Sequence, residues 1–152
     1  MASRGDNYIT YTYRGGERHD IPHDATHIII AESVSVILAE TFRGHRNIVD
    51  IVCHDKVETV EREAFAFCTS LRRVIMPGVE VVERWAFDGC KALAIVECDK
   101  LERIGSGAFR CCESLGSINL PSAKIVGSFA FSYCKALTNV IFGKELESIR
   151  VG

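Results

Sequence analysis

The sequence predicts an α/β solenoid, a chain wound as a stack of similar turns that each hold a short strand and a short helix. Phenylalanine recurs every 22 or 23 residues, at positions 42, 65, 87, 109 and 131. The same apolar residues recur around each of these phenylalanines, so the chain contains five full copies of one unit and the start of a sixth. Such self-similarity is typical of solenoids, because one unit cannot bury its apolar face alone and must stack on its neighbours.

Three segments are expected along the chain. Residues 1–7 are polar and predict a disordered tail. Residues 8–26 do not follow the repeat and predict an N-terminal capping segment, because the terminal repeats of a solenoid need an atypical, more polar cover. Residues 27–152 form the repeat domain, which opens with a half copy whose strand is expected at His27–Ile30.

The capping segment has the pattern of a strand followed by a turn. Ile9, Tyr11 and Tyr13 alternate with polar residues, which is the period of a strand. Gly15 and Gly16 then allow the positive φ of a tight turn. We expect the tyrosine rings to pack on the first repeat with their hydroxyl groups toward water.

Each full copy has two parts, which the copy centred on Phe65 illustrates. Val74–Met76 alternates inward and outward positions, as a strand does. Ala64, Phe65, Cys68 and Leu71 fall at i, i+1, i+4 and i+7, which predicts one face of a short helix. The Val-x-x-Val segment that leads into each predicted helix is a candidate for a second short extended piece.

The charge balance argues against two classes of partner. The 152 residues carry 18 lysines and arginines against 20 aspartates and glutamates, a net charge of −2. No overall field therefore attracts nucleic acid or an anionic membrane, and no apolar run approaches the ~20 residues of a membrane-spanning helix. The start, Met1–Tyr8, lacks the apolar stretch of a secretory signal, so we expect a cytoplasmic protein with no nucleic-acid and no membrane partner.

The cysteines follow the repeat rather than a disulfide pattern. Cys53 and Cys98 share one repeat position, which other copies fill with apolar residues, and Cys111 lies off the repeated positions. Cysteine is among the most buried residue types, so we expect reduced thiols packed in the core. The remaining four of the seven share a second repeat position: Cys68, Cys90, Cys112 and Cys134.

The repeat resembles the leucine-rich repeats of the BspA-like type, which read L-x-x-I-x-x-x-A-F-x-x-C-x-x-L-x-x-I-x-L-P. The copy Leu101–Pro121 meets every position of this pattern, and the resemblance covers residues 27–149. The first copy departs from it, with Thr41 in place of the alanine and His45 in place of the cysteine. The N-terminal Tyr-Arg-Gly-Gly and the alternation of 22 and 23 residues look most like the large set of such proteins predicted in diatom genomes.

This resemblance implies a curved, right-handed leucine-rich-repeat superhelix of five full 22- or 23-residue repeats, with a parallel sheet on one side and an N-terminal cap. Bacterial and protozoan members of the family are often surface adhesins, which implies binding rather than catalysis. Because the family is functionally diverse, no functional residues carry over to this chain.

Neither metal binding nor catalysis has a recognisable set of residues. Zinc sites need four converging ligands, commonly from C-x-x-C pairs, and the sequence contains no such pair. Cys53 beside His54 could suggest a thiolate and its base, but alternation along a strand turns the two side chains to opposite sides. We therefore expect no metal, no cofactor and no enzymatic activity.

The outward positions of the predicted strands are the candidate site. In two columns along the stack, aliphatic residues gather beside a few charges, a pattern that usually marks a binding surface. The alternative is that β-branched residues occur there only because they favour strands and pack across them. The candidate partner-binding residues are Ile29, Asp50, Val52, Arg73, Ile75, Ile95 and Glu97.

The sequence therefore predicts a non-catalytic protein–protein interaction module that binds a protein partner on its strand face. Two alternatives stay open: an extracellular adhesion or surface-protein domain, and a spacer fragment of a larger scaffold or receptor. The sixth copy supplies Leu146 and Ile149 but neither the Ala-Phe pair nor the cysteine. The C-terminal end is then uncapped, so we expect either self-association through this end or further sequence beyond it.

Overall fold

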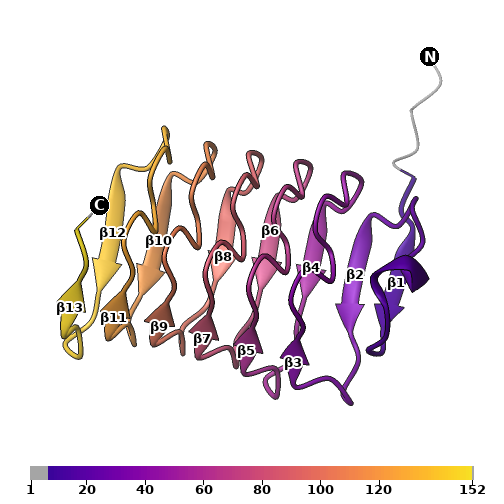
Figure 1. Ribbon diagram of the computed structural model, residues 1–152, viewed down its shortest axis with the longest axis horizontal. Coiled ribbons are helices and arrows are strands. Elements are labelled where there is room, and N and C mark those ends of the chain that lie inside the picture. Colours follow the sequence, from indigo (N-terminus) through magenta and orange to yellow (C-terminus); the bar gives the residue numbers. More distant parts are fainter. Residues whose placement is uncertain (1–6, 152) are drawn as a thin grey trace.

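The structure of the chain is a computed structural model that describes residues 7–151. All but the last residue of the tail expected over residues 1–7 therefore lies outside the described part. The chain winds in successive turns from one end of the molecule to the other, and each turn lies beside the next (Figure 1). Within residues 7–151, no helix is long and apolar enough to cross a membrane.

Each turn contributes one strand to each of two rows. The first row holds a five-stranded sheet of β1 (Thr10–Tyr13), β2 (His27–Ile30), β4 (Asp50–Val52), β6 (Arg73–Ile75) and β8 (Ile95–Glu97), followed by a two-stranded sheet of β10 (Ser117–Leu120) and β12 (Asn139–Phe142). The second row is a six-stranded sheet of β3 (Val36–Ile37), β5 (Thr59–Val60), β7 (Val81–Val82), β9 (Arg103–Ile104), β11 (Ile125–Val126) and β13 (Ser148–Ile149).

All pairs of neighbouring strands are parallel, and their register follows the repeat. Ile28, Ile51 and Val74 pair across β2, β4 and β6, and all three side chains point into the core. The predicted strand at His27–Ile30 is confirmed as β2. The Val-x-x-Val segments do form a second extended piece, and these pieces pair with one another to make the second row.

The predicted helices are wrong, so the fold is a parallel β-solenoid rather than an α/β one. Ala64–Leu71 forms successive turns, and the only helix within the described residues is a short 3-10 helix, η1 (Arg18–Asp20). Glu63 and Phe67, on either side of Phe65, have positive φ values of 55° and 61°, which an α-helix cannot contain. The Phe65 N–H donates to the Ala86 carbonyl of the next turn at 2.8 Å, instead of to the carbonyl four residues earlier.

The core is a column of stacked phenylalanines between the two rows and the turns. The planes of successive rings are nearly parallel, and neighbouring centroids lie 5.0 to 5.5 Å apart. Offset stacking at this distance is favourable for aromatic rings. Four of the rings are fully buried and the last is half-buried; in order they are Phe42, Phe65, Phe87, Phe109 and Phe131.

The repeated cysteines form a second column with a hydrogen-bonding role. Cys68 Sγ donates to the Phe42 carbonyl oxygen at 3.1 Å, and Cys90 Sγ donates to that of Phe65 at 3.1 Å. Cysteine thus supplies a donor to the preceding turn as well as apolar volume, which valine or alanine could not do. All seven cysteines are free, as expected, and burial raises the pKa of the Cys68 thiol to about 12.

The segment expected as a cap lies across the first turn of the repeats. β1 pairs with β2, and the buried Tyr13 ring meets Phe42 edge-on at a centroid distance of 5.2 Å. The Tyr13 hydroxyl does not face water as expected: it donates to the Gly16 carbonyl oxygen at 3.3 Å, because the side chain is buried. His45 stands where later copies have cysteine; its Nε2 lies 3.0 Å from the Pro22 carbonyl, whereas its buried Nδ1 has no partner.

The C-terminal end is less well covered than the N-terminal end. β12 and β13 are the outermost strands of their rows, and each has a neighbour on one side only. Leu137 and Phe142, which correspond to fully buried residues of earlier copies, are only half-buried. The last turn therefore presents apolar side chains and unpaired strand edges at the surface.

Candidate protein-binding face

The seven predicted residues come together on one surface. We call this surface the strand face: the outward side of β2, β4, β6 and β8 in the five-stranded sheet. Strand pairing aligns them in two columns, with one column of Asp50, Arg73 and Ile95 and the other of Ile29, Val52, Ile75 and Glu97. Because the side-chain period of a strand is two, the residues between these columns point into the core.

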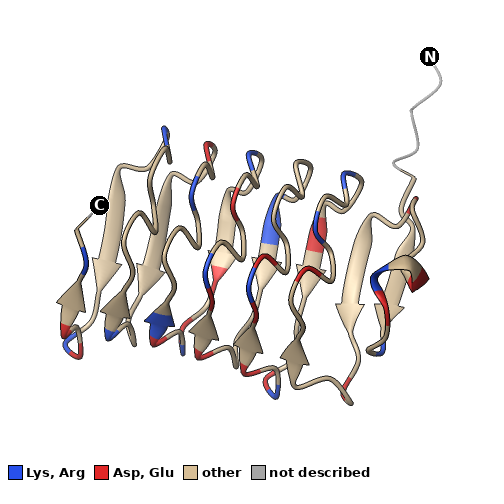
Figure 2. Cartoon of the chain, in the orientation of Figure 1, with Lys and Arg blue, Asp and Glu red and all other residues tan. Residues whose placement is uncertain are grey.

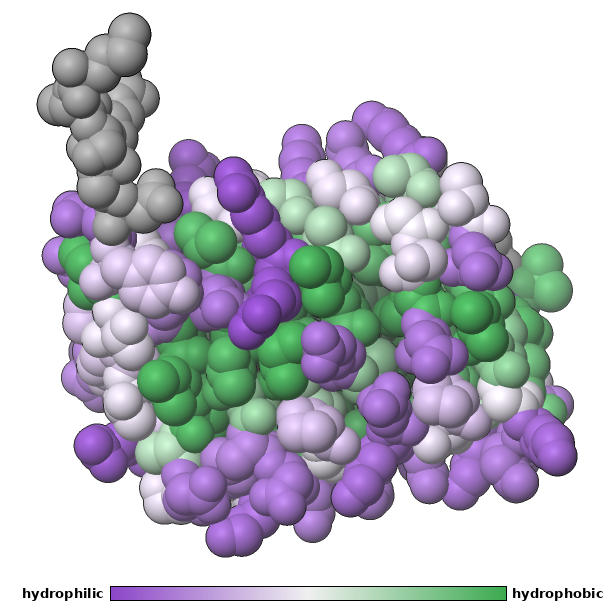
Figure 3. Space-filling model, turned by 180° about the vertical axis from the view of Figure 1, so that it is seen from behind, coloured by the Kyte–Doolittle hydropathy of each residue, from purple (hydrophilic) through white to green (hydrophobic). Residues whose placement is uncertain are grey.

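Aliphatic side chains occupy the middle of the strand face. Ile29 is 46% exposed and Ile95 is 50% exposed, whereas Val52 and Ile75 are half-buried between their neighbours. Figure 3 shows this face: apolar surface runs from turn to turn and is bordered by polar groups. A cluster of this kind on rigid strands differs from the scattered apolar residues that any protein surface carries.

One ion pair crosses the strand face. Arg73 Nε lies 3.1 Å from Asp50 Oδ1 on the neighbouring strand, and Figure 2 shows the acidic position on β4 beside the basic position on β6. The Arg73 side chain is 46% exposed, so the pair contributes at most about 1 kcal/mol to stability. Glu97 forms no ion pair within residues 7–151, which leaves its carboxylate available to a partner.

The strand face ends where backbone pairing between neighbouring strands of the first row is interrupted. β8 and β10 lie close together, but no registered strand pairing joins them, so the row divides into two sheets there. Val96 in β8 is only half-buried, whereas Val74 and Ile118 in the flanking strands are buried. All seven predicted residues thus lie on the sheet that includes the cap, and none lies beyond the interruption.

Cys53 and His54, the pair weighed for cysteine–histidine catalysis, lie in different surroundings. Cys53 is buried, and burial raises its pKa to about 12, which keeps the thiol protonated. His54 Nε2 lies 2.9 Å from the Ala31 carbonyl, so the ring is engaged with backbone. Among residues 7–151, no group of three or more His, Cys, Asp or Glu side chains could hold a metal ion.

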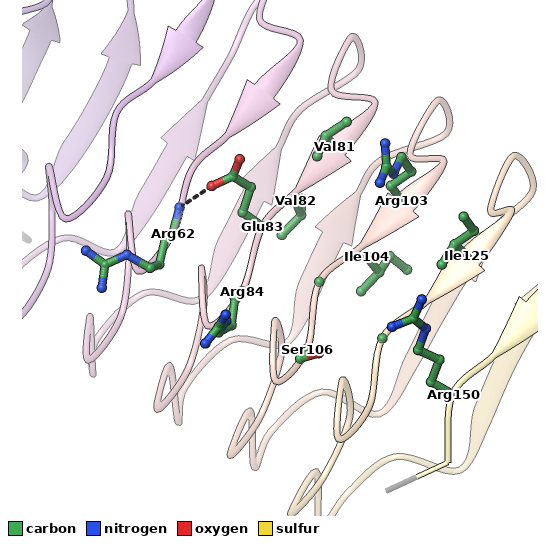
Figure 4. Close-up of a pocket in the computed structure, with 12 residues that line it drawn as sticks. Arg62, Val81, Val82, Glu83, Arg84, Arg103, Ile104, Ser106, Ile125 and Arg150 are labelled. Carbon is green, nitrogen blue, oxygen red and sulfur yellow. Dashed lines mark hydrogen bonds between the residues drawn. The ribbon is translucent and has the colours of Figure 1, made fainter.

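A shallow groove on the second row carries arginines that do not converge. It has a volume of about 480 Å³ and includes Arg62, Arg84, Arg103 and Arg150. Figure 4 shows their guanidinium groups pointing in different directions, with the Arg62 backbone N–H donating to Glu83 Oε2 at 3.0 Å. The Arg62 guanidinium is held by Glu40 and Glu63. This groove offers no single point at which several donors meet.

The turns that carry the phenylalanine column form a third side of the molecule. We call it the turn side. There the residues two before and two after each core phenylalanine have positive φ, and several of them are large and exposed: Phe67, Trp85, Phe129 and Tyr133. A Cβ added to Gly89 would lie 2.7 Å from the Phe67 ring, so the glycine makes room for it. Gly107 makes room for Trp85 in the same way, at 2.4 Å.

Solved structures of three bacterial proteins resemble this fold. A leucine-rich repeat protein from Bacteroides ovatus aligns with a TM-score of 0.74 and 28% identity, over 84% of this chain and 33% of the other. The T. pallidum leucine-rich repeat protein aligns with a TM-score of 0.57 and 22% identity, over 77% and 72%. A leucine-rich cell surface protein from Faecalibacterium prausnitzii aligns with a TM-score of 0.56 and 20% identity, over 97% and 35%.

The last two of these likenesses, at 22% and 20% identity, concern the fold alone. The chain spans about a third of the B. ovatus protein. No curated protein matches it significantly. Residues 35–152 match the family described as BspA type leucine-rich repeat region, in six copies, which confirms the resemblance seen in the sequence. The chain belongs to the BspA-type leucine-rich repeat family.

Proposed function

We propose that the chain is a non-catalytic protein–protein interaction module whose partner binds on the strand face. One observation carries the proposal: four aliphatic residues, two exposed and two half-buried, lie at outward positions of four successive strands, with charges beside them in the same two columns. The strands hold these side chains in place before binding, so little ordering entropy is lost when a partner docks. The repeat family and its fold are typically non-catalytic, which agrees with this proposal.

The proposal gives the apolar and the charged residues different roles. Burial of Ile29, Ile75 and Ile95 against the partner would supply affinity. Asp50, Arg73 and Glu97 would penalise partners with the wrong charges and fix the register of binding. A partner with an apolar ridge and a complementary set of charges fits this arrangement.

A pair of matched double variants tests the proposal. Arg73→Glu with Ile95→Asp changes two outward side chains that pair across the strand face, and Arg103→Glu with Ile125→Asp makes the same changes on two residues that pair across the second row. Affinity capture from the source cells identifies the partner, and calorimetry with the purified partner then measures Kd. We expect melting temperatures close to that of the wild type for both variants, with binding lost only in the first.

The opposite pattern would contradict the proposal. If the strand-face variant kept the wild-type Kd while folded, the partner would have to bind elsewhere. Equal losses in the two variants would indicate a general electrostatic effect rather than a specific face.

The free thiols support a cytoplasmic location as part of this proposal. All seven cysteines are free, and the cytosol keeps thiols reduced. Two alternatives are an extracellular adhesion domain and a spacer in a larger scaffold or receptor. Fractionation of the source cells distinguishes them, because recovery at the cell surface would favour adhesion. The likeness to diatom proteins stays a prediction.

We also propose that the C-terminal end mediates self-association. The unpaired edges of β12 and β13 and the half-buried Phe131 and Leu137 would be covered by a second copy. Sheet edges and apolar side chains together are a common basis of association between chains. Light scattering over a range of concentrations tests this, and a monomer of constant mass at the highest concentration would contradict it.

A further inference from the structure

A second surface, on the turn side near the N-terminal end, is strongly basic. Two adjoining hollows of about 580 and 570 Å³ lie there, and they share Arg18, Arg43 and Arg46. We call them together the basic groove. It is lined by five of the 18 lysines and arginines of the chain but by only one of its 20 acidic residues, Asp88. The five are Arg18, Arg43, Arg46, Lys91 and Arg110.

The repeat brings these cations to one side. Arg43 and Arg110 each follow a core phenylalanine, so they occupy the same position in two different turns. Arg46 and Lys91 likewise share a position, directly after the residue of the cysteine column. Arg18 reaches the groove from the cap, where its Nη2 donates to the Arg43 carbonyl oxygen.

Three of the five cations are not neutralised by the chain itself. Arg110 Nε lies 3.2 Å from Asp88 Oδ1, and Arg43 Nε lies 3.3 Å from Glu63 Oε2. Within residues 7–151, no carboxylate forms an ion pair with Arg18, Arg46 or Lys91. A local excess of positive charge in a chain of net charge −2 is therefore available to an external anion.

A histidine beside these cations has a lowered pKa. The pKa of His45, which lines the groove, is lowered chiefly by burial and further by the charges of His23 and Arg18. The Arg18 charge is the smallest of the causes of this lowered pKa, and it acts in the direction that also favours a nearby anion.

Phe67 gives the groove an apolar centre. Its side chain is 44% exposed and lies on the Gly89 backbone, while the Arg43 guanidinium carbon lies 5.6 Å from the ring centroid. The Arg43 guanidinium lies over one face of the ring and Gly89 lies beside its Cδ1–Cε1 side, so a ligand would meet the remaining exposed surface and edge of the ring. Single-strand binders stack successive bases on several aromatic side chains, whereas the groove presents one exposed phenyl ring, so it lacks the platform of such a binder. An aliphatic side chain can pack against a ring edge.

We propose that the basic groove binds an extended acidic peptide segment. The cations extend over the turns from Arg43 to Arg110 instead of converging on one point, which suits a chain of carboxylates better than one compact anion. Phe67 would contact an apolar side chain between the carboxylates. This site is separate from the strand face and does not depend on the function proposed for it.

Fluorescence polarisation with the full chain tests the proposal. The probe is a short fluorescein-labelled peptide of alternating glutamate and leucine, and the competitor is an oligothymidylate with the same number of negative charges. Lys91→Glu and, separately, Arg46→Glu should each weaken peptide binding about tenfold, because reversal of an unpaired cation replaces attraction by repulsion. Lys100→Glu, which reverses another exposed lysine in a loop outside the groove, should leave the Kd unchanged.

The other outcomes would overturn the proposal. One such outcome is the absence of saturable peptide binding. Another is a loss of peptide affinity in Lys100→Glu equal to that in Lys91→Glu, and a third is tighter binding of the oligothymidylate than of the peptide. Melting temperatures check that the variants fold. A measurement on the wild type is independent of any variant: peptide titration should shift the backbone amide resonances of Gly44 and Gly89, and shifts confined to the strand face would also overturn it.

Discussion

The strand face and the turn side are built by the same turns of chain, but they differ in what their residues depend on. On the strand face, outward residues such as Ile95 project from regular parallel strands and need nothing from the next turn. On the turn side, Phe67 fits only because Gly89 lacks a side chain, and Trp85 only because of Gly107. The strand face can therefore change without loss of the fold, which is what a surface selected for a partner requires.

The largest expected effect is the loss of unfolding free energy when a buried phenylalanine of the turns is truncated, compared with an apolar residue of the strand face. Phe87→Ala should lower the free energy of unfolding by about 3–5 kcal/mol, because Phe87 is fully buried in the ring column. Ile95→Ala, at a half-exposed position of the strand face, should lower it by less than about 1 kcal/mol. Urea denaturation measures both. Similar values for the two variants would remove the distinction between core column and free surface.

Two glycines, one on the turn side and one in the first row, should differ in their tolerance of a side chain. Gly89, on the turn side, has φ +72°, and a Cβ there would meet the Phe67 ring, so Gly89→Ala should destabilise the chain by about 1–3 kcal/mol. Gly116 precedes β10 in the first row, and a Cβ there would come no closer than 3.9 Å to the Ala136 carbonyl oxygen. Gly116→Ala should be close to neutral by thermal denaturation. A destabilised Gly116→Ala with a neutral Gly89→Ala would contradict the account.

A smaller effect on stability is expected when pH changes the protonation of His45, at the N-terminal end of the turn side. Burial lowers the pKa of His45 below 6.5, so the unfolded chain takes up the proton more readily than the folded one. The contribution of His45 to stability is then complete above pH 6.5 and is lost as the pH falls through and below that value. His45→Cys, which restores the residue of the later copies, should reduce this decline in melting temperature. An unchanged pH profile would show that His45 does not titrate with folding.

The rates at which the thiols react with an alkylating reagent test the packing of the turns without any change of sequence. Burial raises the pKa of Cys134 to about 11 and those of Cys90 and Cys112 well above the usual value, so these thiols should react slowly with an alkylating reagent. Cys111 lies outside the column and is half-buried, so it should be labelled first. Mass spectrometry of the native protein over time gives the order. Early labelling of Cys90 would mean that the reagent reaches the cysteine column in the native protein.

The strand face could be predicted from the sequence because its geometry is simple. Alternation assigns inward and outward residues, and a constant repeat length is enough to place Asp50 beside Arg73 on the neighbouring strand. The i, i+1, i+4, i+7 spacing around Phe65 was misleading, because a run of turns with positive φ at Glu63 and Phe67 buries the same side chains as a helix. The repeat length alone does not distinguish the two.

The turn side was harder to predict because its contacts join different repeat positions. One available signal was missed: glycine recurs at 44, 89 and 107, at positions that other copies fill with large residues. That alternation indicates close packing between turns and a backbone that tolerates positive φ. The basic groove depends on Arg18 reaching Arg43 from the cap, a contact between an irregular segment and a repeat that no periodic pattern encodes.

Methyl NMR of the complex with the captured partner shows which row of strands the partner contacts. The isoleucine δ1 methyl groups report on both rows of strands at once. We predict that partner binding shifts or broadens the signals of Ile29, Ile75 and Ile95 on the strand face, while those of Ile125 and Ile149 on the second row stay in place. Unchanged signals from the strand face, with shifts at Ile125 and Ile149, would contradict the account.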